Sequence, residues 1–274
     1  HLCGGVCMRY VRLIVTAHDA YWLDAAVREF TGYSSSIISC DSETGLERPL
    51  STDETPDGRP GAAILVFGFS AKALAAVVPN RAGQCLMTCP TTAVYDGLSS
   101  GEERIALGKT IRFFGDGFQK SKLVGGRRFW RIPVMDGEFL IEHMVHVDKG
   151  VGGGNIILQA ENQSSALAAV RRAIAAIDSL KGVITPFPGG VARSGSKVGS
   201  RYKKLKASTA DAYCPTLRGR VESRLAAGAN AAYEIVIDGV DEERVAAAMA
   251  QGIRAAAGSG VVAITAGNYG GKLG

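Results

Sequence analysis

The sequence has few of the residues that mark metal centres and disulfide frameworks. Its 274 residues include six cysteines and four histidines. No two cysteines have the two-residue spacing of a zinc ribbon, and His143 and His146 are too close in sequence for a zinc-binding histidine pair. We therefore predict no metal site, and we expect the cysteines to be buried as small hydrophobic residues.

Long hydrophobic runs are also absent. No apolar run reaches the roughly 18 residues of a membrane span, and no secretory leader is recognisable. These absences predict a cytoplasmic protein with no membrane contact. Apolar residues make up 46% of the chain and charged residues 21%, which is typical of a globular core. The charge of 31 − 26 = +5 permits acidic ligands, nucleic acid or an acidic partner, and selects none of them.

What the sequence does contain is a repeated alternation of short apolar runs and helix-period segments. It predicts strands at 11–17, 35–40, 62–69, 84–89, 154–161, 182–187, 232–239 and 260–267, with helices near 19–31, 71–80, 163–180 and 241–257 and a loop-rich middle. Each half then forms two βαβ units. We predict an α+β fold of two ferredoxin-like βαβ-repeat lobes with a cleft between them. The N-terminal lobe covers residues 1–146 and the C-terminal lobe covers 147–274.

One predicted strand, "AYEIVIDG" (232–239), carries a carboxylate in its middle. Alternation places Tyr233, Ile235 and Ile237 on one face, and Glu234, Val236 and Asp238 on the other. If the isoleucines pack on the helices, Glu234 projects from the opposite face of the sheet. We expect another lobe or subunit to cover that face. Glu234 is therefore a candidate for a partly desolvated functional acid.

Two other stretches invite a function. "GGVARSGSKVGS" (189–200) fails the phosphate-loop pattern because Ser196 separates Gly195 from Lys197. The basic run "RYKKLK" (201–206), together with Arg193 and Lys197, is interpreted as a solvated loop that attracts an acidic ligand. RNA binding is less favoured because the aromatic pattern of an RNA-recognition strand is absent.

Two polar loops leave alternatives open. In "ASTADAYCPT" (207–216), the hydroxyls of Ser208, Thr209, Tyr213 and Thr216 either bind a polar ligand or satisfy their own loop. In "DETPDGRPG" (53–61), an Asp57–Arg59 pair that organises the turn is preferred over contact with a substrate.

Several stretches in order resemble one family, the formylmethanofuran:tetrahydromethanopterin formyltransferases. They are "DETPDGRPG", "GQCLMTCPT" (83–91), "FFGDGFQ" (113–119), "PFPGG" (186–190), "SKVGS" (196–200), "ASTADAYCPT", "YEIVIDG" (233–239) and "AGNYGGKLG" (266–274). The likeness runs along nearly the whole chain. The basic charge balance favours the bacterial members, which work in formyltransferase/hydrolase complexes.

The resemblance implies a one-carbon transferase that moves a formyl group between the amine of a methanofuran-type coenzyme and N5 of a tetrahydromethanopterin-type coenzyme. It implies no metal and no prosthetic group, a homo-oligomer (dimer or tetramer), possible hydrolase-complex subunits as partners, and no nucleic acid. The family's catalytic glutamate corresponds to Glu234. A tetrahedral intermediate needs a group that takes a proton from one nitrogen and gives it to the other, which a carboxylate can do.

The remaining site residues are candidates for substrate binding. They are Pro188, Gly189, Gly190, Ser196, Lys197, Ser208, Thr209 and Asn155. Backbone N–H groups of "PFPGG" or "SKVGS" and the Asn155 side chain are candidate donors to the oxyanion. The alternative functions are a non-catalytic subunit that docks carriers for a hydrolase complex and, less favoured, an RNA-binding module.

Overall fold

The computed structural model describes residues 6–266, and the chain folds into two compact units. The N-terminal unit comprises residues 8–34 and 41–149. Among the described residues, the C-terminal unit comprises Val6 and Cys7, Ser35–Cys40 and residues 150–266. Within residues 6–266, no helix is both long and apolar enough to cross a membrane.

The N-terminal unit contains a mixed sheet whose strands run in the order β2-β3-β1-β4-β8-β7-β6. Its strands are β1 (Val6–Thr16), β2 (Glu43–Leu50), β3 (Gly61–Gly68), β4 (Ala93–Asp96), β5 (Glu103–Ala106), β6 (Lys120–Val124), β7 (Arg127–Val134), β8 (Gly137–Glu142) and the start of β9 (Met144–Ala160). Its helices are α1 (Ala20–Thr31), α2 (Ala71–Arg81) and α3 (Gly108–Ile111). The order β2-β3-β1-β4, with α1 and α2 as the two crossovers, is ferredoxin-like.

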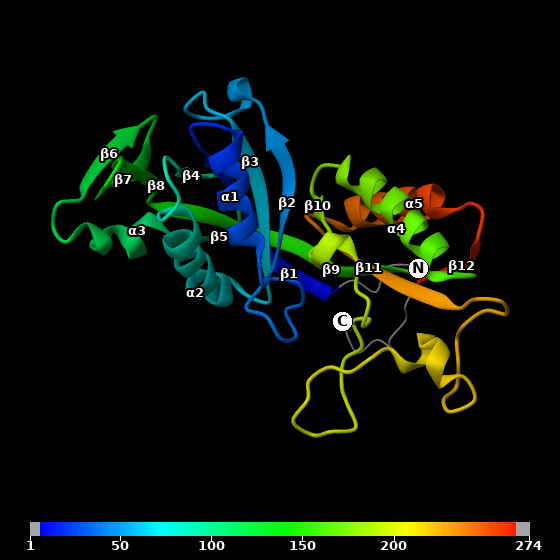
Figure 1. The fold of residues 1–274 in the computed structure, drawn as a ribbon. Coiled ribbons are helices and arrows are strands. Elements are labelled where there is room, and N and C mark those ends of the chain that lie inside the picture. Colours follow the sequence, from blue (N-terminus) through cyan, green and yellow to red (C-terminus); the bar gives the residue numbers. More distant parts are fainter. Residues whose placement is uncertain (1–5, 267–274) are drawn as a thin grey trace. The chain divides into compact units, whose positions relative to one another are not determined.

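The N-terminal core forms where the two longer helices cover this sheet (Figure 1). All eight residues of β3 are buried, as expected for a central strand. Phe30 of α1 and Leu74 and Val78 of α2 pack in the same cluster. Asp19 caps α1 by accepting from the backbone N–H groups of Tyr21 and Trp22.

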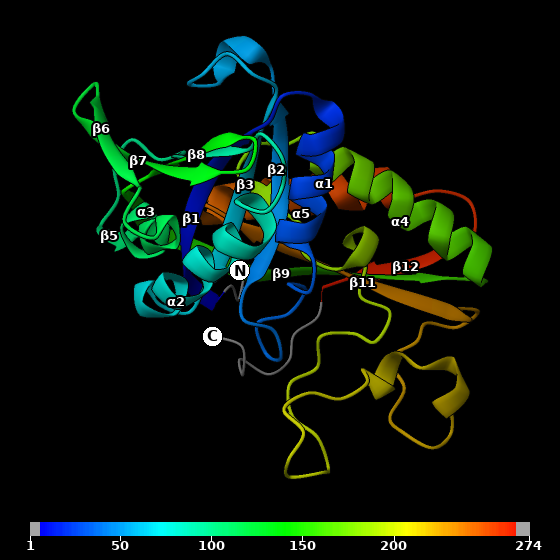
Figure 2. The same cartoon turned by 60° about the vertical axis from the view of Figure 1, so that its left-hand side comes forward.

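The C-terminal unit repeats the plan with strand order β10-β11-β9-β12. Its further elements are β10 (Val183–Ile184), β11 (Ala231–Gly239), β12 (Val261–Thr265), α4 (Gln163–Asp178) and α5 (Glu242–Ala256). Figure 1 shows α4 and α5 on one side of these strands and the long connection between β10 and β11, in yellow, on the other. Figure 2 shows from a second direction that α4 and this connection lie on opposite sides of β11. The α+β fold with two ferredoxin-like βαβ-repeat halves is thus confirmed.

Alanine-rich helix faces make the C-terminal core compact. Ala166, Ala169 and Ala173 of α4 are fully buried against Ile156 and Leu158 of β9. Small side chains let the helices lie close to the sheet. Gly252 of α5 fits the same rule, since a Cβ there would lie 2.9 Å from Ile177 Cδ1.

Two predicted strands are wrong. Residues 35–40 form turns, with Cys40 N–H donating to Ser36 O, and the strand follows at β2. Residues 84–89 continue α2 into a π-helical turn (Ala82–Leu86), and the strand follows at β4. The apolar Leu86 enters the core from that turn, so burial alone did not distinguish helix from strand. The predicted loop-rich middle contains the strands β5 to β8.

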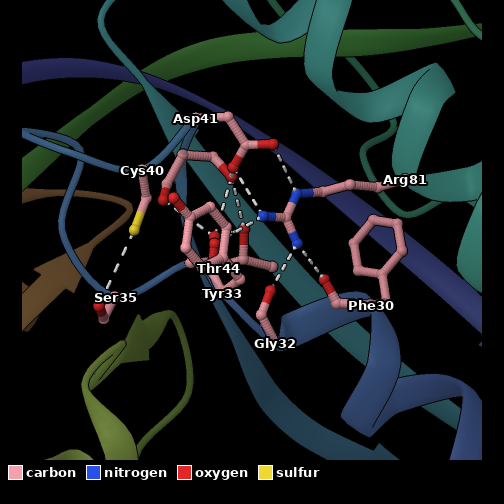
Figure 3. Close-up of polar contacts among 10 residues, drawn as sticks. Phe30, Gly32, Tyr33, Ser35, Cys40, Asp41, Thr44 and Arg81 are labelled. Carbon is pink, nitrogen blue, oxygen red and sulfur yellow. Dashed lines mark hydrogen bonds and ion pairs between the residues drawn. The ribbon is translucent and has the colours of Figure 1, made fainter.

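Arg81 contacts the chain on both sides of the segment 35–40, which the sequence had predicted to be a strand. Its guanidinium donates to the carbonyl oxygens of Phe30, Gly32 and Tyr33 at 2.7–3.0 Å and to Asp41 at 2.6 Å (Figure 3). These carbonyls end α1, where a cation is favourable. Arg81 therefore holds the point where the chain leaves α1 close to the point where it returns at Asp41.

The structure describes five of the six cysteines. The five cysteines described are free, and none is fully buried: Cys7 is exposed and the others are partly exposed. The expectation of buried cysteines is therefore wrong for these five. Groups of three or more His, Cys, Asp or Glu side chains that could hold a metal ion do not occur in this part of the chain. The "AGNYGGKLG" stretch lies outside the described residues beyond Ala266.

Candidate active site

Glu234 lies on the face of the C-terminal sheet that points away from α4 and α5. Ile235 and Ile237, its neighbours in β11, pack in the helix-covered core, as the alternation predicts. In the pairing of β11 with β9, Glu234 is directly opposite Ile157, which makes Asn155 its diagonal neighbour on the same face. The Glu234 side chain is only 3% exposed.

The cover over Glu234 comes from the C-terminal unit itself. Ala192 and Glu234 form an antiparallel bridge, with backbone hydrogen bonds of 2.8 and 3.2 Å. Farther along the strand, Gln159 accepts from Ala226 N–H and donates to Arg224 O. The segment 192–226, between β10 and β11, thus covers this face at Glu234. We expected another lobe or subunit to do so, and for this part of the face that expectation is wrong.

Three donors hold the Glu234 carboxylate. Asn155 Nδ2 donates to Oε1 at 3.0 Å, Ser196 Oγ donates to Oε1 at 2.8 Å, and Ser196 N–H donates to Oε2 at 2.6 Å. Hydrogen bonds to an ionised acceptor are among the stronger ones in proteins. Because both oxygens are held, the carboxylate has a fixed orientation.

Gly195 lets the chain come this close to the carboxylate. Its φ of +75° is in the left-handed region, which favours glycine. A Cβ there would lie 2.4 Å from Ala210 Cβ and 3.5 Å from Glu234 Oε2. Gly195 therefore determines where Ser196 meets Glu234.

The segment after Ser196 folds into a hairpin with a basic tip. Val198 bridges to Ala207, Gly199 N–H donates to Lys206 O, and Ser208 Oγ donates to Gly199 O. The tip, residues 201–206, is exposed throughout. The basic run is thus solvated, as predicted.

Lys197 is paired within this loop. Its Nζ lies 2.7 Å from Asp211 Oδ1. The hydrogen bond from Lys197 lowers the pKa of Asp211 below its usual value. This ion pair links the hairpin to the segment that follows it.

Two hollows lie on this part of the C-terminal unit, and Glu234 lines the smaller of them. A small one of about 30 Å³ is lined by Glu234 together with residues of both flanking segments, among them Arg193, Gly195 and Tyr213. A larger one of about 890 Å³ shares Arg193, Tyr213 and Tyr233 with it and extends to Phe187 and Pro188. The buried carboxylate therefore lines the small hollow, and the larger one, which is big enough for a ligand, shares residues with the small one but is not lined by Glu234.

The predicted site residues separate into four groups. Asn155 and Ser196 contact Glu234 directly, and Pro188 and Thr209 line the larger hollow. Ser208 makes a contact within the hairpin, and Lys197 pairs with Asp211 in the segment that follows it. Gly189 is exposed and Gly190 is buried against Ile174 of α4, and neither lines the two hollows.

Four of the candidate oxyanion donors are engaged inside the protein. Gly190 N–H donates to Phe187 O, Gly199 N–H to Lys206 O, and both Ser196 N–H and Asn155 Nδ2 to Glu234. The hydroxyl residues of the loop 207–216 differ in their contacts. Ser208 donates to a backbone carbonyl of its own hairpin, whereas Thr209, Tyr213 and Thr216 line the larger hollow. The sequence did not identify Phe187 and Tyr233 as residues that line the larger hollow. A partly buried aromatic residue is usually expected to belong to the hydrophobic core.

The N-terminal unit has a separate polar network at the "DETPDGRPG" loop. Asp57 Oδ2 accepts from Thr16 Oγ1 at 2.8 Å, Arg59 Nε at 2.8 Å and Tyr95 Oη at 2.9 Å. Burial alone would raise the pKa of Asp57, and these hydrogen bonds outweigh it, so the pKa is lowered. The Asp57–Arg59 pair organises this loop, as preferred from the sequence.

Comparison with known proteins identifies the family along the whole chain. Residues 2–134 match the family model described as formylmethanofuran-tetrahydromethanopterin formyltransferase, and residues 137–274 match that of the FTR proximal lobe. The formyltransferase of that name from Methylococcus capsulatus is 52% identical over 271 residues, covering 97% of this chain and 91% of the relative. A subunit of the formyltransferase/hydrolase complex from Methylorubrum extorquens is 47% identical over 272 residues, covering 96% and 87%.

Two solved structures agree with this. A chain of the formyltransferase/hydrolase complex from Methylorubrum extorquens, crystallised with methylofuran, has a TM-score of 0.94 and 45% identity, with 98% of this chain and 91% of that chain covered. The formyltransferase from Methanosarcina barkeri has a TM-score of 0.92 and 42% identity, with 98% and 92% covered. The chain therefore belongs to the formylmethanofuran–tetrahydromethanopterin formyltransferase family, and it is a formyltransferase.

Proposed function

We propose that this formyltransferase moves a formyl group between the amine of a methanofuran-type coenzyme and N5 of a tetrahydromethanopterin-type coenzyme, with Glu234 as the proton shuttle. Family membership supports the reaction. The observation that carries the mechanism is the Glu234 carboxylate, which is buried, accepts hydrogen bonds from Asn155 and Ser196 and lines a small hollow.

The chemistry requires one proton to change nitrogen. The neutral N5 attacks the formyl carbon, the carbonyl π bond opens, and a tetrahedral adduct forms with negative charge on oxygen and positive charge on N5. The Glu234 carboxylate takes the proton from N5. It then returns the proton to the amine nitrogen of the first coenzyme as the C–N bond breaks and the carbonyl re-forms. No proton, electron or cofactor is consumed overall.

The surroundings of Glu234 suit that role. A fixed carboxylate loses little orientational freedom when it meets the adduct. Ser196 Oγ, 2.8 Å from Oε1, donates to the carboxylate while it is charged, and the hydroxyl can rotate when Glu234 holds the proton. Asn155 and Ser196 therefore act as positioning residues in this proposal, in place of the substrate contacts predicted from their sequence.

The direct test replaces Glu234 by glutamine, which keeps the shape and removes the acid. We expect kcat to fall by about 100-fold or more with little change in KM, because general acid–base help contributes roughly 10²–10⁴-fold. The matched control is Glu222→Gln, an exposed carboxylate in the same loop. Near-normal turnover of Glu234→Gln would remove this residue from the mechanism.

The same assay addresses the alternative of a subunit that only docks carriers. The isolated chain is incubated with both carriers, and transfer is followed directly. Turnover without any hydrolase subunit supports the enzyme, whereas turnover that appears only with such subunits favours the docking function. A salt-dependent gel shift with RNA tests the third function.

We also propose that the chain works in the cytoplasm, without a prosthetic group, as a homo-oligomer or with hydrolase-type subunits. The solved complex of a relative with 45% identity supports the last possibility. Light scattering on the purified protein measures the oligomeric state. A mass of 28.7 kDa for the particle would contradict self-association.

A further inference from the structure

Strand β6 (Lys120–Val124) is an edge of the N-terminal sheet. It comes last in the order of strands, and within residues 6–266 it pairs with β7 alone. Figures 1 and 2 both show it at the outer end of that sheet, beyond β7. All five of its residues are exposed. An edge strand presents unpaired backbone N–H and C=O groups, on which a further strand can form.

The turn between β6 and β7 determines which backbone groups face outward. Its two glycines, residues 125–126, have φ angles of +55° and +78°, which fit a two-residue type I′ turn. The residues that flank such a loop, here Val124 and Arg127, form a hydrogen-bonded pair. Hydrogen-bonded and non-hydrogen-bonded pairs alternate along the ladder. The N–H and C=O groups of Ser121 and Leu123 therefore face away from β7, toward the place of an added strand.

The hairpin of β6 and β7 is strongly basic. Residues 120–131 contain five lysines and arginines and no aspartate or glutamate. Two of the arginines, at positions 127 and 131, are paired with glutamates of β8. The other three cations are Lys120, Lys122 and Arg128, and none of them makes an ion pair with another described residue. The edge therefore carries a positive charge that the described part of the protein does not neutralise.

This charge distinguishes between the candidate occupants of the edge. Two copies of β6 side by side would bring their lysines together, and like charges across from each other are destabilising. Lysines on an edge strand are one means by which proteins prevent such self-pairing. An acidic strand gains instead, because a carboxylate across from Lys120 or Lys122 forms a favourable cross-strand pair. These two lysines alternate with Ser121 and Leu123, so they share one face and select acids at alternate positions.

We infer that β6 is a docking edge for an extended acidic segment of another protein, which adds to the sheet as an antiparallel strand. The outward backbone groups of Ser121 and Leu123 supply its hydrogen bonds. Lys120 and Lys122 select for negative charge. Leu123 is 63% exposed and Val124 is 50% exposed, so they offer apolar contact. The inference does not depend on formyl transfer, because β6 is in the N-terminal unit and the candidate active site is in the C-terminal unit.

The binding experiment uses a defined peptide and the full chain. The peptide is Thr-Val-Val-Glu-Thr-Glu-Thr, capped at both ends and labelled with a fluorophore, so that its glutamates lie across from Lys122 and Lys120. Fluorescence polarisation should give a Kd on the order of 0.1 mM, which suits a short strand. A peptide with glutamine in place of both glutamates should bind about fivefold more weakly, because it loses two cross-strand charge pairs.

A proline variant tests the backbone pairing. Ser121→Pro removes one outward N–H and keeps the ladder with β7, and proline is tolerated at such edge positions. It should weaken binding of the acidic peptide at least about tenfold. Ser121→Ala is the matched control, because it removes the hydroxyl that accepts from Arg128 but keeps the N–H. Its affinity should remain within about twofold of the wild type. Circular dichroism checks that both variants fold.

Charge variants test the selection for acids without changing the backbone. The double variant Lys120→Gln, Lys122→Gln should bind the acidic peptide about fivefold more weakly and the glutamine peptide as the wild type does. Lys72→Gln, which removes an exposed lysine of α2 in the same unit, should bind both as the wild type does. Equal affinity of the two peptides for the wild type, unchanged affinity in Ser121→Pro, or no saturable binding would overturn the inference.

Two further measurements test the other occupants. Light scattering compares the oligomeric state of the wild type and Ser121→Pro, and it should be the same. A smaller particle in the variant would make the edge an interface between copies of this chain. A single-stranded oligonucleotide should bind more weakly than the acidic peptide. Tighter binding that is lost in the double lysine variant and kept in Ser121→Pro would make the edge a nucleic-acid contact. Either result would overturn the inference.

Discussion

Gly195 offers the sharpest test of how the loop builds the site. Its left-handed φ of +75° and the 2.4 Å separation expected between a Cβ and Ala210 Cβ both oppose a side chain. Carbon atoms normally pack at about 3.5–4.0 Å, so an alanine would have to shift its surroundings by about 1 Å. The neighbour is a backbone-anchored Cβ, which cannot rotate away. The shift would move Ser196, whose N–H lies 2.6 Å from Glu234 Oε2.

The size of the effect follows from two terms. The left-handed conformation costs a non-glycine residue about 1–2 kcal/mol. Overpacking adds about 1–3 kcal/mol. We expect Gly195→Ala to lower kcat by at least about tenfold, which corresponds to about 1.4 kcal/mol lost from the transition state. The free energy of unfolding should fall by no more than these two costs together, because a loop with no buried side chain from Arg193 to Gly228 can shift and relieve part of the strain.

The control and a rescue variant isolate the two terms. Gly219→Ala has the same conformational cost, with φ of +76°, but a Cβ there meets nothing within 4 Å. Its kcat should remain within about threefold of the wild type, since it adds no steric clash. Ala210→Gly removes the atom that an alanine at position 195 would strike, so the double variant should recover most of the lost turnover.

Steady-state kinetics are measured on the wild type, Gly195→Ala, Gly219→Ala and the double variant, and they test whether the steric clash lowers kcat. A double variant no more active than Gly195→Ala, or a Gly219→Ala variant equally impaired, would refute the steric argument.

Two further predictions concern the N-terminal unit. Arg81→Gln removes the donors to three carbonyls and to Asp41 (Figure 3), and should lower the free energy of unfolding by about 3 kcal/mol in urea titration, with Arg28→Gln as the exposed control. Asp57 has a lowered pKa, so its stabilising contribution is present above its ordinary value of 3.8 and is lost as pH falls through the lower folded value. The stability difference between wild type and Asp57→Asn should therefore shrink as pH falls below 3.8, and a constant difference would contradict this.

Periodicity in the sequence predicted the elements that bury a regular face. The helices at α4 and α5 carry alanines at helical spacing, and β11 alternates Ile235 and Ile237 with Glu234. Each pattern reports which residues face the core, and the core clusters contain those residues. The face of Glu234 was predictable for this reason.

Short apolar runs carried less information. Residues 35–40 and 84–89 each have apolar residues flanked by polar ones, and either a strand or a helical turn can bury them. The strand β2 was missed because Glu47, Arg48 and Pro49 do not resemble a strand. Within residues 6–266, β2 pairs only with β3, so it lies at an edge, where proline and charge are tolerated.

The loop that covers Glu234 could be described from the sequence only by its composition. Between Arg193 and Gly228 no side chain is buried. The sequence there has no periodic pattern of apolar residues from which a helix or strand could be predicted. Its shape depends instead on left-handed glycines such as Gly195 and Gly199, and on hydrogen bonds to partners such as Glu234 and Gln159. These partners lie more than 30 positions away along the chain, beyond the reach of local patterns.

Residue type also conceals whether a polar side chain binds a substrate or holds a catalytic group. Asn155 and Ser196 have the donors that either role needs. In the fold they meet the same carboxylate from two directions, one from β9 and one from the covering loop. Because a buried carboxylate requires such donors before any ligand arrives, polar residues beside it are engaged first by the protein.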